Sequence, residues 1–289
     1  MSDLRLTDLD AEPACELPAL ELFRAAQAGR NHAVCGEPSR MGLSPELTDL
    51  RQALGVLCAV EQDQVLGALA ICPYSDEQVT LWGPVVAPAE RRRGIGSELL
   101  RETRAAIRDG GFQSLRVLVD ERNRIARAFC LAHGLSPWKH DLVFEHSLGR
   151  TPHEMVAGVC LARSEDLDEV ARLLRQGFPE SSYCDAPLAQ RERQGYRHYL
   201  YQESGAILAA ATVRTQTARN WLNMLTVAPD VRGTGLGERL LAGVLHLEAA
   251  LGIRRMGLEV LADNPAAIRL YQKVGFRRSW SCTIMTGPL

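Results

Sequence analysis

The feature that most constrains this chain is a glycine-anchored pattern that occurs twice in one register. Residues 86–96 and 227–237 both contain Val-Ala-Pro, then an arginine, then Gly-x-Gly. Gly94 and Gly235 are 141 residues apart (235 − 94), and the same offset recurs further along the chain, relating Gly111 to Gly252, Asn123 to Asn264 and Gly134 to Gly275. Chance similarity does not hold its register over so long a stretch. We therefore predict two copies of one domain, over residues 1–148 and 156–289.

Length and composition agree with this prediction and exclude several functions. The 289 residues are enough for two domains of roughly 100–200 residues each. A net charge of −2 gives no reason to expect nucleic acid or an anionic membrane as partner. No apolar run approaches the ~20 residues needed to span a bilayer, and the start of the chain lacks a signal-peptide pattern. The eight cysteines are scattered, which favours buried thiols over disulfides or a metal site. We expect a cytoplasmic protein without metal, as a monomer or homodimer.

Each copy has the same alternation of hydrophobic patterns. A strand and an amphipathic helix open it, three strands follow, and the glycine pattern then leads into a helix, a strand, a helix and a last strand. Asn123 and Asn264 suit helix N-caps, and Pro265 directly after the second supports that start. Gly134 and Gly275 suit the stops of these helices. The pattern predicts a mixed α/β (α+β) domain that is present in two tandem copies.

The glycine pattern has the properties of a pyrophosphate site. It lies between a strand and a helix, where the first N–H groups of the helix are unpaired and the positive end of its dipole lies behind them. Glycines let an anion approach the backbone, and arginines add donors for phosphate oxygens. A lone Gly-x-Gly is more often an ordinary tight turn, but its duplication favours phosphate binding. The predicted binding residues are Val86, Arg91, Arg92, Arg93, Gly94, Ile95, Gly96 and Ser97 in the first copy, and Val227, Arg232, Gly233, Thr234, Gly235, Leu236, Gly237, Glu238 and Asn264 in the second.

These residues resemble the signature of the GCN5-related N-acetyltransferase (GNAT) superfamily. That signature is Arg/Gln-x-x-Gly-x-Gly/Ala after the fourth strand, followed by Asn-x-x-Ala-x-x-Leu-Tyr-x-x-x-Gly-Phe. The second copy supplies this segment in register, as Asn264, Ala267, Leu270, Tyr271, Gly275 and Phe276. The tandem layout is similar to that of mycothiol synthase and other two-domain members. The resemblance implies a mixed, mostly antiparallel sheet flanked by helices in each domain, acetyl-CoA as co-substrate, and an amine as acceptor.

The resemblance also implies catalytic roles for two residues of the second copy. Tyr271 occupies the position of the tyrosine that commonly protonates the leaving thiolate. The segment from Leu258 to Tyr271 resembles ribosomal-protein alanine N-acetyltransferases, in which the glutamate matching Glu259 is the base. Strand alternation places Glu259 on the face opposite Leu258 and Val260. A glutamate at a solvated strand edge, or one paired with a neighbouring arginine such as Arg255, is an equally good interpretation.

The first copy differs where the chemistry is expected. The equivalent of Tyr271 is Cys130 (271 − 141), and the equivalent of Glu259 is Leu118 (259 − 141). A leucine cannot carry protons, and a buried structural thiol is the favoured interpretation of the cysteine. We hypothesise that the N-terminal domain keeps a CoA-binding turn but is catalytically degenerate.

The sequence thus predicts an acyl-CoA-dependent N-acyltransferase. It would transfer acetyl from acetyl-CoA to a primary amine by direct attack in the C-terminal domain, with a small-molecule amine as the expected acceptor. A non-catalytic CoA-binding or sensing protein and a protein (N-terminal or lysine) acetyltransferase are the alternatives. Residues 177–185, with Glu180 and Asp185, together with Tyr196 and Trp221, are candidates for the rim of the acceptor site.

Overall fold

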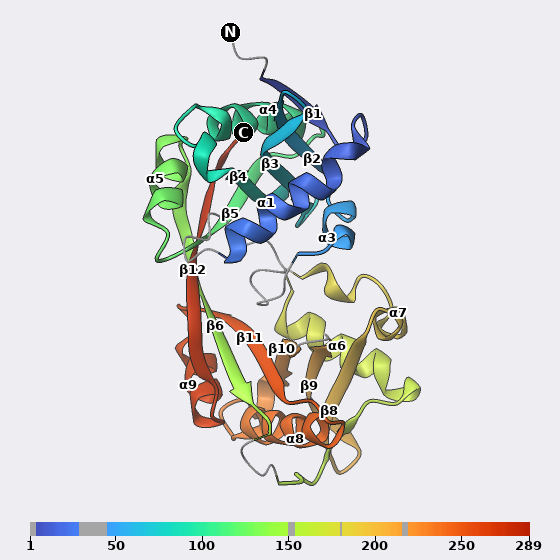
Figure 1. Cartoon of the computed structure of the whole chain (residues 1–289). Helices are drawn as coiled ribbons and strands as arrows, with labels where there is room; N and C mark the ends of the chain where they lie inside the picture. Colours follow the sequence, from blue (N-terminus) through green and yellow to red (C-terminus); the bar gives the residue numbers. More distant parts are fainter. Residues whose placement is uncertain (1–3, 29–44, 150–153, 180, 216–218) are drawn as a thin grey trace. The chain divides into compact units, whose positions relative to one another are not determined.

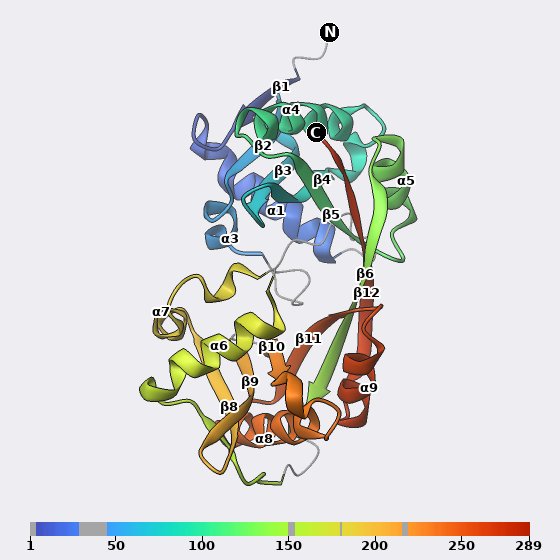
Figure 2. The ribbon, with the colours of Figure 1, turned by 180° about the vertical axis from the view of Figure 1, so that it is seen from behind.

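The computed structural model describes residues 4–28, 45–149, 154–179, 181–215 and 219–289. The chain divides into two compact units, which we call unit 1 (Met1–Asp141 with Ser281–Leu289) and unit 2 (Leu142–Trp280). Figures 1 and 2 show the elements of both units from opposite sides. Glu180, a candidate for the acceptor site, lies outside the described residues.

Unit 1 is built on a mixed sheet with the order β1-β2-β3-β4-β5-β12-β6. The strands β1 to β4 are antiparallel neighbours, and β4 and β5 are parallel. The elements of the first copy are β1 (Arg5–Asp8), α1 (Glu16–Ala28), α3 (Leu47–Arg51), β2 (Gly55–Glu61), β3 (Gln64–Pro73), β4 (Gln78–Val86), α4 (Ile95–Asp109), β5 (Ser114–Asp120), α5 (Arg124–Ala132) and β6 (Ser136–Ser147).

Unit 2 repeats this arrangement, with the order β12-β6-β11-β10-β9-β8-β7. Here β7 to β10 are antiparallel neighbours, and β10 and β11 are parallel. The elements of the second copy are β7 (Val159–Leu161), α6 (Leu167–Gly177), α7 (Leu188–Arg193), β8 (Tyr196–Glu203), β9 (Ala206–Arg214), β10 (Asn220–Val227), α8 (Leu236–Ala250), β11 (Arg255–Leu261), α9 (Pro265–Lys273) and β12 (Arg277–Pro288).

The predicted order of elements is confirmed, with the short helices α3 and α7 as additions. The predicted caps are also confirmed. Asn123 Oδ1 accepts a hydrogen bond from the Ala126 N–H (3.0 Å), and Asn264 Oδ1 accepts one from the Ala267 N–H (3.1 Å). Because each cap satisfies an otherwise unpaired N–H group, it fixes where α5 and α9 begin.

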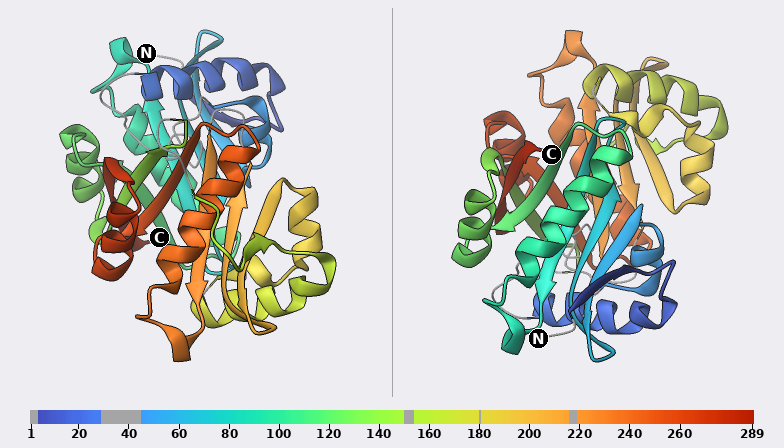
Figure 3. Two further views of the ribbon diagram at one scale, coloured as in Figure 1. Left: turned by 90° about the horizontal axis from the view of Figure 1, so that it is seen from below. Right: turned by 90° about the horizontal axis from the view of Figure 1, so that it is seen from above.

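Helices cover both faces of each sheet. In unit 1, Phe23 of α1 stacks on Trp82 (ring centroids 4.2 Å apart), whereas α4 packs on the opposite face against Gly67. In unit 2, one core joins α8 and α9 to the sheet residues Tyr199, Ala211 and Leu258, and a second core joins α6 and α7 to Leu200, Ala210 and Met224. Since neighbouring strand residues point to opposite faces, these two cores lie on opposite sides of one sheet. Figure 3 shows α4 and α8, each lying along the strands of its own sheet.

The last strand of each copy belongs to both units. The first half of β6 lies in unit 1 and the rest in unit 2, and β12 passes from unit 2 into unit 1 in the same way. In unit 1, β12 pairs antiparallel with β5, from Cys282↔Asp120 to Pro288↔Ser114. The compact units therefore follow contacts, whereas the predicted ranges 1–148 and 156–289 follow the repeat in the sequence.

Candidate functional site

The two glycine turns have the same backbone conformation. Gly94 and Gly235 are the N-caps of α4 and α8, in the left-handed region with φ of 85° and 89°. Two residues earlier, Arg92 and Gly233 also have positive φ, 68° and 79°. A side chain at the N-cap position, Gly94 or Gly235, would be strained, so the turn requires glycine there. The repeated pattern in the sequence thus corresponds to a repeated shape.

One arginine holds each turn against the end of its strand. Arg91 Nε donates to the carbonyl oxygen of Val86 (3.1 Å), and Arg232 Nε donates to that of Val227 (3.0 Å). Both side chains belong to exposed residues. Each arginine therefore carries its guanidinium beside the start of the following helix.

The start of each helix has the properties of an anion site. The N-cap glycines of α4 and α8 have no side chain to cap the helix. The first hydrogen bonds to Gly94 O come from the N–H groups of Ser97 and Glu98, and those to Gly235 O from Glu238 and Arg239. An added Cβ on Gly94 or Gly235 would meet no atom within 4 Å, so open space lies before these amides. Unpaired N–H groups and the helix dipole favour an anion here.

In unit 1 this turn borders a cavity of about 530 Å³. The cavity is lined by seven of the eight residues predicted to bind phosphates in this copy, namely Val86, Arg91, Arg92, Gly94, Ile95, Gly96 and Ser97. Its other walls come from the end of β4, from Val117 of β5 and from α5, including Phe129 and Cys130. The cavity thus extends from the turn to the position equivalent to Tyr271.

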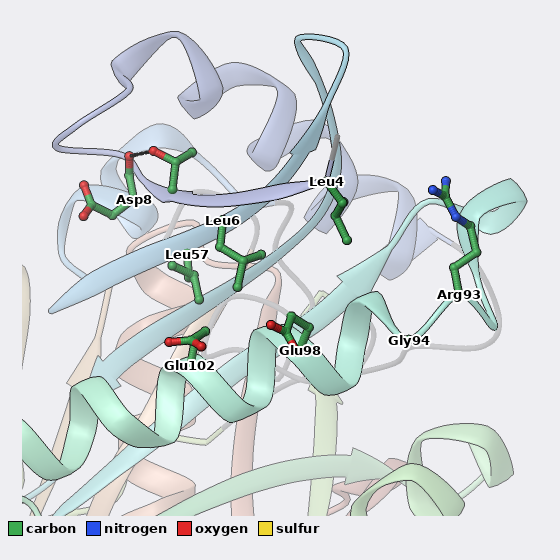
Figure 4. A pocket seen from close by; sticks show the side chains of 9 residues that line it. Leu4, Leu6, Asp8, Leu57, Arg93, Gly94, Glu98 and Glu102 are labelled. Atoms are coloured by element: carbon green, nitrogen blue, oxygen red, sulfur yellow. Dashed lines mark hydrogen bonds between the residues drawn. The ribbon is translucent and has the colours of Figure 1, made fainter. Parts of the chain in front are cut away.

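Arg93, the eighth predicted residue, lies elsewhere. Its guanidinium forms ion pairs with Glu61 (2.8 Å) and Glu90, and these hydrogen bonds raise its pKa. It lines a separate hollow of about 680 Å³ between β1, β2 and α4. Figure 4 shows Arg93 at one end of that hollow, with Glu98 and Glu102 of α4 facing β1 and β2. Geometry therefore separates Arg93 from the other predicted phosphate ligands of unit 1.

The remaining predicted residues of the turns have structural contacts. Ser97 Oγ is 2.9 Å from His133 Nε2, and Glu238 forms an ion pair with Lys273 Nζ (2.6 Å). Thr234 Oγ1 donates to the carbonyl oxygen of Val231 (2.7 Å). Gly96 and Gly237 are packed more tightly than Gly94 and Gly235. A Cβ on them would lie 3.5 Å from Phe129 of α5 and from Leu270 of α9, respectively. The second glycine of each pattern therefore brings two helices together.

The parallel strands beside each turn separate before they end. The ladder between β10 and β11 runs from Asn220↔Met256 to Leu222↔Leu258, and beyond it the strands continue to Val227 and Leu261. A register shift between Leu222 and Met224 lies where the ladder ends, which marks a bulge in β10. In unit 1, the ladder between β4 and β5 similarly ends at Leu81↔Val117.

The two predicted catalytic residues lie on opposite faces of unit 2. Tyr271 is buried in the core formed by α8 and α9, with its ring 6.0 Å from that of Phe276, and burial raises its pKa to about 12. Leu258 and Val260 belong to this same core. Glu259 lies between these two residues in the sequence and is half-buried. As the strand alternation predicts, it projects to the opposite face of the sheet, which α6 covers. Both residues flank the stretch where β10 and β11 separate.

Among the residues that the structure describes, none activates Cys130 in the way that a nucleophile needs. Burial raises the pKa of its thiol to about 11, so the thiol is protonated at neutral pH. The ring of His133 is engaged elsewhere, since Nδ1 is 2.8 Å from the carbonyl oxygen of Phe129 and Nε2 contacts Ser97. A wall of the cavity is the role that this geometry gives Cys130.

Apart from Tyr183, which belongs to the candidate range 177–185, the buried polar residues of the α6 face were not predicted. His198 and Thr212 are fully buried and lie opposite each other on β8 and β9, and the ring of Tyr183 is 6.4 Å from that of His198. Burial lowers the pKa of His198 and raises that of Tyr183, so both are neutral at pH 7. Arg219 is buried at the start of β10. His198 and Thr212 are brought together by the pairing of β8 and β9, which their local sequence does not reveal.

No helix among the described residues is long and apolar enough to cross a membrane. Within the same residues, no cluster of three or more histidine, cysteine, aspartate or glutamate side chains is arranged to hold a metal ion.

Comparisons with known proteins agree with the repeat. Residues 22–135 and 167–276 each match the "Acetyltransferase (GNAT) family". The chain is 31% identical to a mycothiol acetyltransferase from Mycolicibacterium gilvum, with 89% of each chain covered. Among solved structures, a GCN5-related N-acetyltransferase from Sphaerobacter thermophilus aligns with a TM-score of 0.75 at 18% identity, covering 99% of this chain and 95% of the other.

A tandem GNAT protein from the clavulanic acid biosynthesis pathway aligns with a TM-score of 0.74 at 22% identity, covering 99% of this chain and 98% of the other. At these identities the structural likeness speaks for the fold, and the sequence matches speak for the activity. The family matches twice, and the mycothiol acetyltransferase relative aligns over 89% of both chains. The chain therefore belongs to the acetyltransferase (GNAT) family and is an N-acetyltransferase with two GNAT domains.

Proposed function

We propose that the second copy transfers the acetyl group of acetyl-CoA to the primary amine of a small molecule. The observation that carries this proposal is the contrast between the copies. Both have the same uncapped glycine turn, but only the second has a tyrosine and a glutamate beside its separating strands, at Tyr271 and Glu259. The relatives named mycothiol acetyltransferase support a small-molecule acceptor.

The residues present suit acetyl-CoA in its usual role as an activated acetyl donor. The amides at the start of α8, with Arg232 beside them, would hold the diphosphate, and Val227 lies where the chain enters this turn. Glu259 would accept a proton from the attacking amine, directly or through water. The Tyr271 hydroxyl would donate a hydrogen bond to the sulfur as negative charge develops on it.

The first copy would bind CoA without turning it over. Its cavity is lined by the turn residues but meets Cys130 where the second copy has Tyr271, and Leu118 stands in place of Glu259. We propose that CoA in this cavity stabilises unit 1. Arg93 would contribute to the fold, through Glu61 and Glu90, and not to phosphate binding.

Release of free thiol from acetyl-CoA in the presence of an amine panel tests the proposal, with mass spectrometry of the acetylated products. We expect thiol release that depends on an amine and that falls by about 10²- to 10⁴-fold in Glu259→Gln, the range typical of a lost general base. Glu102→Gln, a half-buried glutamate of α4 in unit 1 that faces β1 and β2, is the matched control. Unchanged turnover in Glu259→Gln would remove that residue from the mechanism, and modification of proteins alone would favour a protein acceptor.

A further inference from the structure

A charged cluster at the start of β10 and β11 is not needed by the chemistry proposed above. Arg219 precedes β10, Arg255 opens β11, and both donate to Glu145 of β6, Arg255 at 2.7 Å. Two guanidinium groups thus share one carboxylate. Within the described residues, the ion pairs of this cluster therefore set two positive charges against one negative charge.

Arg219 also has donors that are not used. Its side chain is 5% exposed, and its Nε and Nη2 atoms are buried without a hydrogen-bond acceptor among the described residues. Burial lowers its pKa to about 10, which still leaves it charged at neutral pH. Buried donors without acceptors are costly and rare, so each one calls for an explanation such as a ligand or a water.

The fold itself does not require this charge. At the 141-residue offset, the counterparts of Arg219, Arg255 and Glu145 in unit 1 are Gln78 (219 − 141), Ser114 (255 − 141) and Thr286 (145 + 141). These three side chains are neutral and bonded to one another: Gln78 Nε2 donates to Ser114 Oγ (2.9 Å) and to Thr286 Oγ1 (3.3 Å). A satisfied neutral cluster fills this position equally well, so the charged one is specific to the copy that has Glu259 and Tyr271.

The cluster lies beside the candidate base. The Arg219 guanidinium is 5.1 Å from the centre of the Trp221 ring, and that ring covers Gly257, where an added Cβ would meet it at 2.5 Å. Gly257 and Glu259 are two residues apart on β11, so they share the α6 face with about 6.6–6.8 Å between them. Arg219 Nε lies 3.4 Å from the Cβ that Gly257 would carry, so a small molecule of this length reaches from Arg219 toward Glu259.

We propose that Arg219 binds a carboxylate of the acceptor, so that the preferred substrates are amines that also carry a carboxylate group, as amino acids do. This inference rests on the proposed function of unit 2. The two unused donors, Nε and Nη2, form one edge of the guanidinium, and that edge matches the two oxygens of a carboxylate. The amine of the same molecule then lies toward Glu259.

The test compares amines that differ only in the carboxylate. Glycine against glycinamide and β-alanine against β-alaninamide are assayed for thiol release from acetyl-CoA, with rates referred to the free-base amine. We expect kcat/KM to be at least about 10-fold higher for the carboxylate member, mainly through KM, since a hydrogen bond to a charged group is worth about that factor. Arg219→Gln should abolish this preference and Arg219→Lys should keep part of it. Gln78→Ala, at the equivalent position in unit 1, should leave it unchanged.

The outcomes separate the inference from the proposed function. Equal rates for both members in the unmodified protein would overturn the carboxylate site while amine acetylation stands. If no amine is acetylated, the proposed function fails. Calorimetric titration of the CoA-loaded protein with N-acetylglycine against N-acetylglycinamide then still tests the site, and equal or no binding of the two would overturn it. Thermal unfolding and CoA binding show whether Arg219→Gln is folded. If this variant does not fold, the preference of the unmodified protein for the carboxylate member of each pair decides the test.

Discussion

Replacing Tyr271 by phenylalanine isolates the contribution of one buried hydroxyl. The ring packs in the core of unit 2 beside Phe276, and phenylalanine keeps this packing. The change therefore leaves the fold and the CoA turn intact and removes only the group that would face the leaving sulfur. The equivalent position in unit 1 is Cys130, which is also buried, so Cys130→Ala is the control.

The size of the effect follows from the pKa of the hydroxyl. Burial raises the pKa of Tyr271 to about 12, whereas a thiol is near ~8.5. Complete transfer of the phenolic proton to the thiolate is then uphill by about 3.5 pKa units, or about 5 kcal/mol. The hydroxyl should act as a hydrogen-bond donor that stabilises the developing charge. Such a bond to a charged group contributes about 1.5–3 kcal/mol, so we expect kcat to fall by about 10- to 150-fold.

Steady-state thiol release at saturating acetyl-CoA measures this, together with the KM for acetyl-CoA. We expect kcat to fall in Tyr271→Phe while the affinity for CoA stays the same, and Cys130→Ala to have no effect on kcat. A change of less than about threefold in kcat would refute the assigned role. A fall of the same size in Cys130→Ala would place the chemistry in unit 1 instead.

Three further predictions test the turns and the stability of unit 2. Gly235→Ala forces an L-residue to φ 89°, at a cost of about 1–2 kcal/mol, and should remove one CoA site in calorimetric titration, whereas Gly94→Ala should remove the other and leave turnover. Glu248 is fully buried and bound by Arg197 (2.8 Å), so Glu248→Gln should lower the free energy of unfolding in urea by about 3 kcal/mol; no loss would mean that the pair is dispensable. The raised pKa of Tyr271 means that the folded state retains its proton longer than the unfolded state. The stability that Tyr271 contributes should therefore be retained below pH 10 and fall by about 2.3 kcal/mol by pH 12, a loss that Tyr271→Phe should remove.

The local features of the fold were predictable because their signals are local. A helix cap such as Asn264 satisfies an N–H group three residues away, and a glycine such as Gly235 is required by its own φ. The repeat made these signals stronger, since each was seen twice. The alternation that turns Glu259 away from Leu258 likewise depends only on the strand.

The features that were missed depend on contacts between distant segments. Arg219, Arg255 and Glu145 come together only because β6, β11 and β10 are neighbours in one sheet. Arg93 matches the phosphate pattern, but its partner Glu61 is on β2, 32 residues earlier in the chain. Neither pairing leaves a mark in the sequence near the residues concerned.

The passage of β6 and β12 from one unit into the other has a consequence for the ancestry and assembly of the protein. Exchange of a terminal strand is a common way for two identical subunits to form a dimer. Fusion of their genes would turn that encounter between molecules into one within a single chain, at a high and constant effective concentration. Cleaving the polypeptide between the halves should make folding depend on protein concentration once more, as it would have for the ancestral pair.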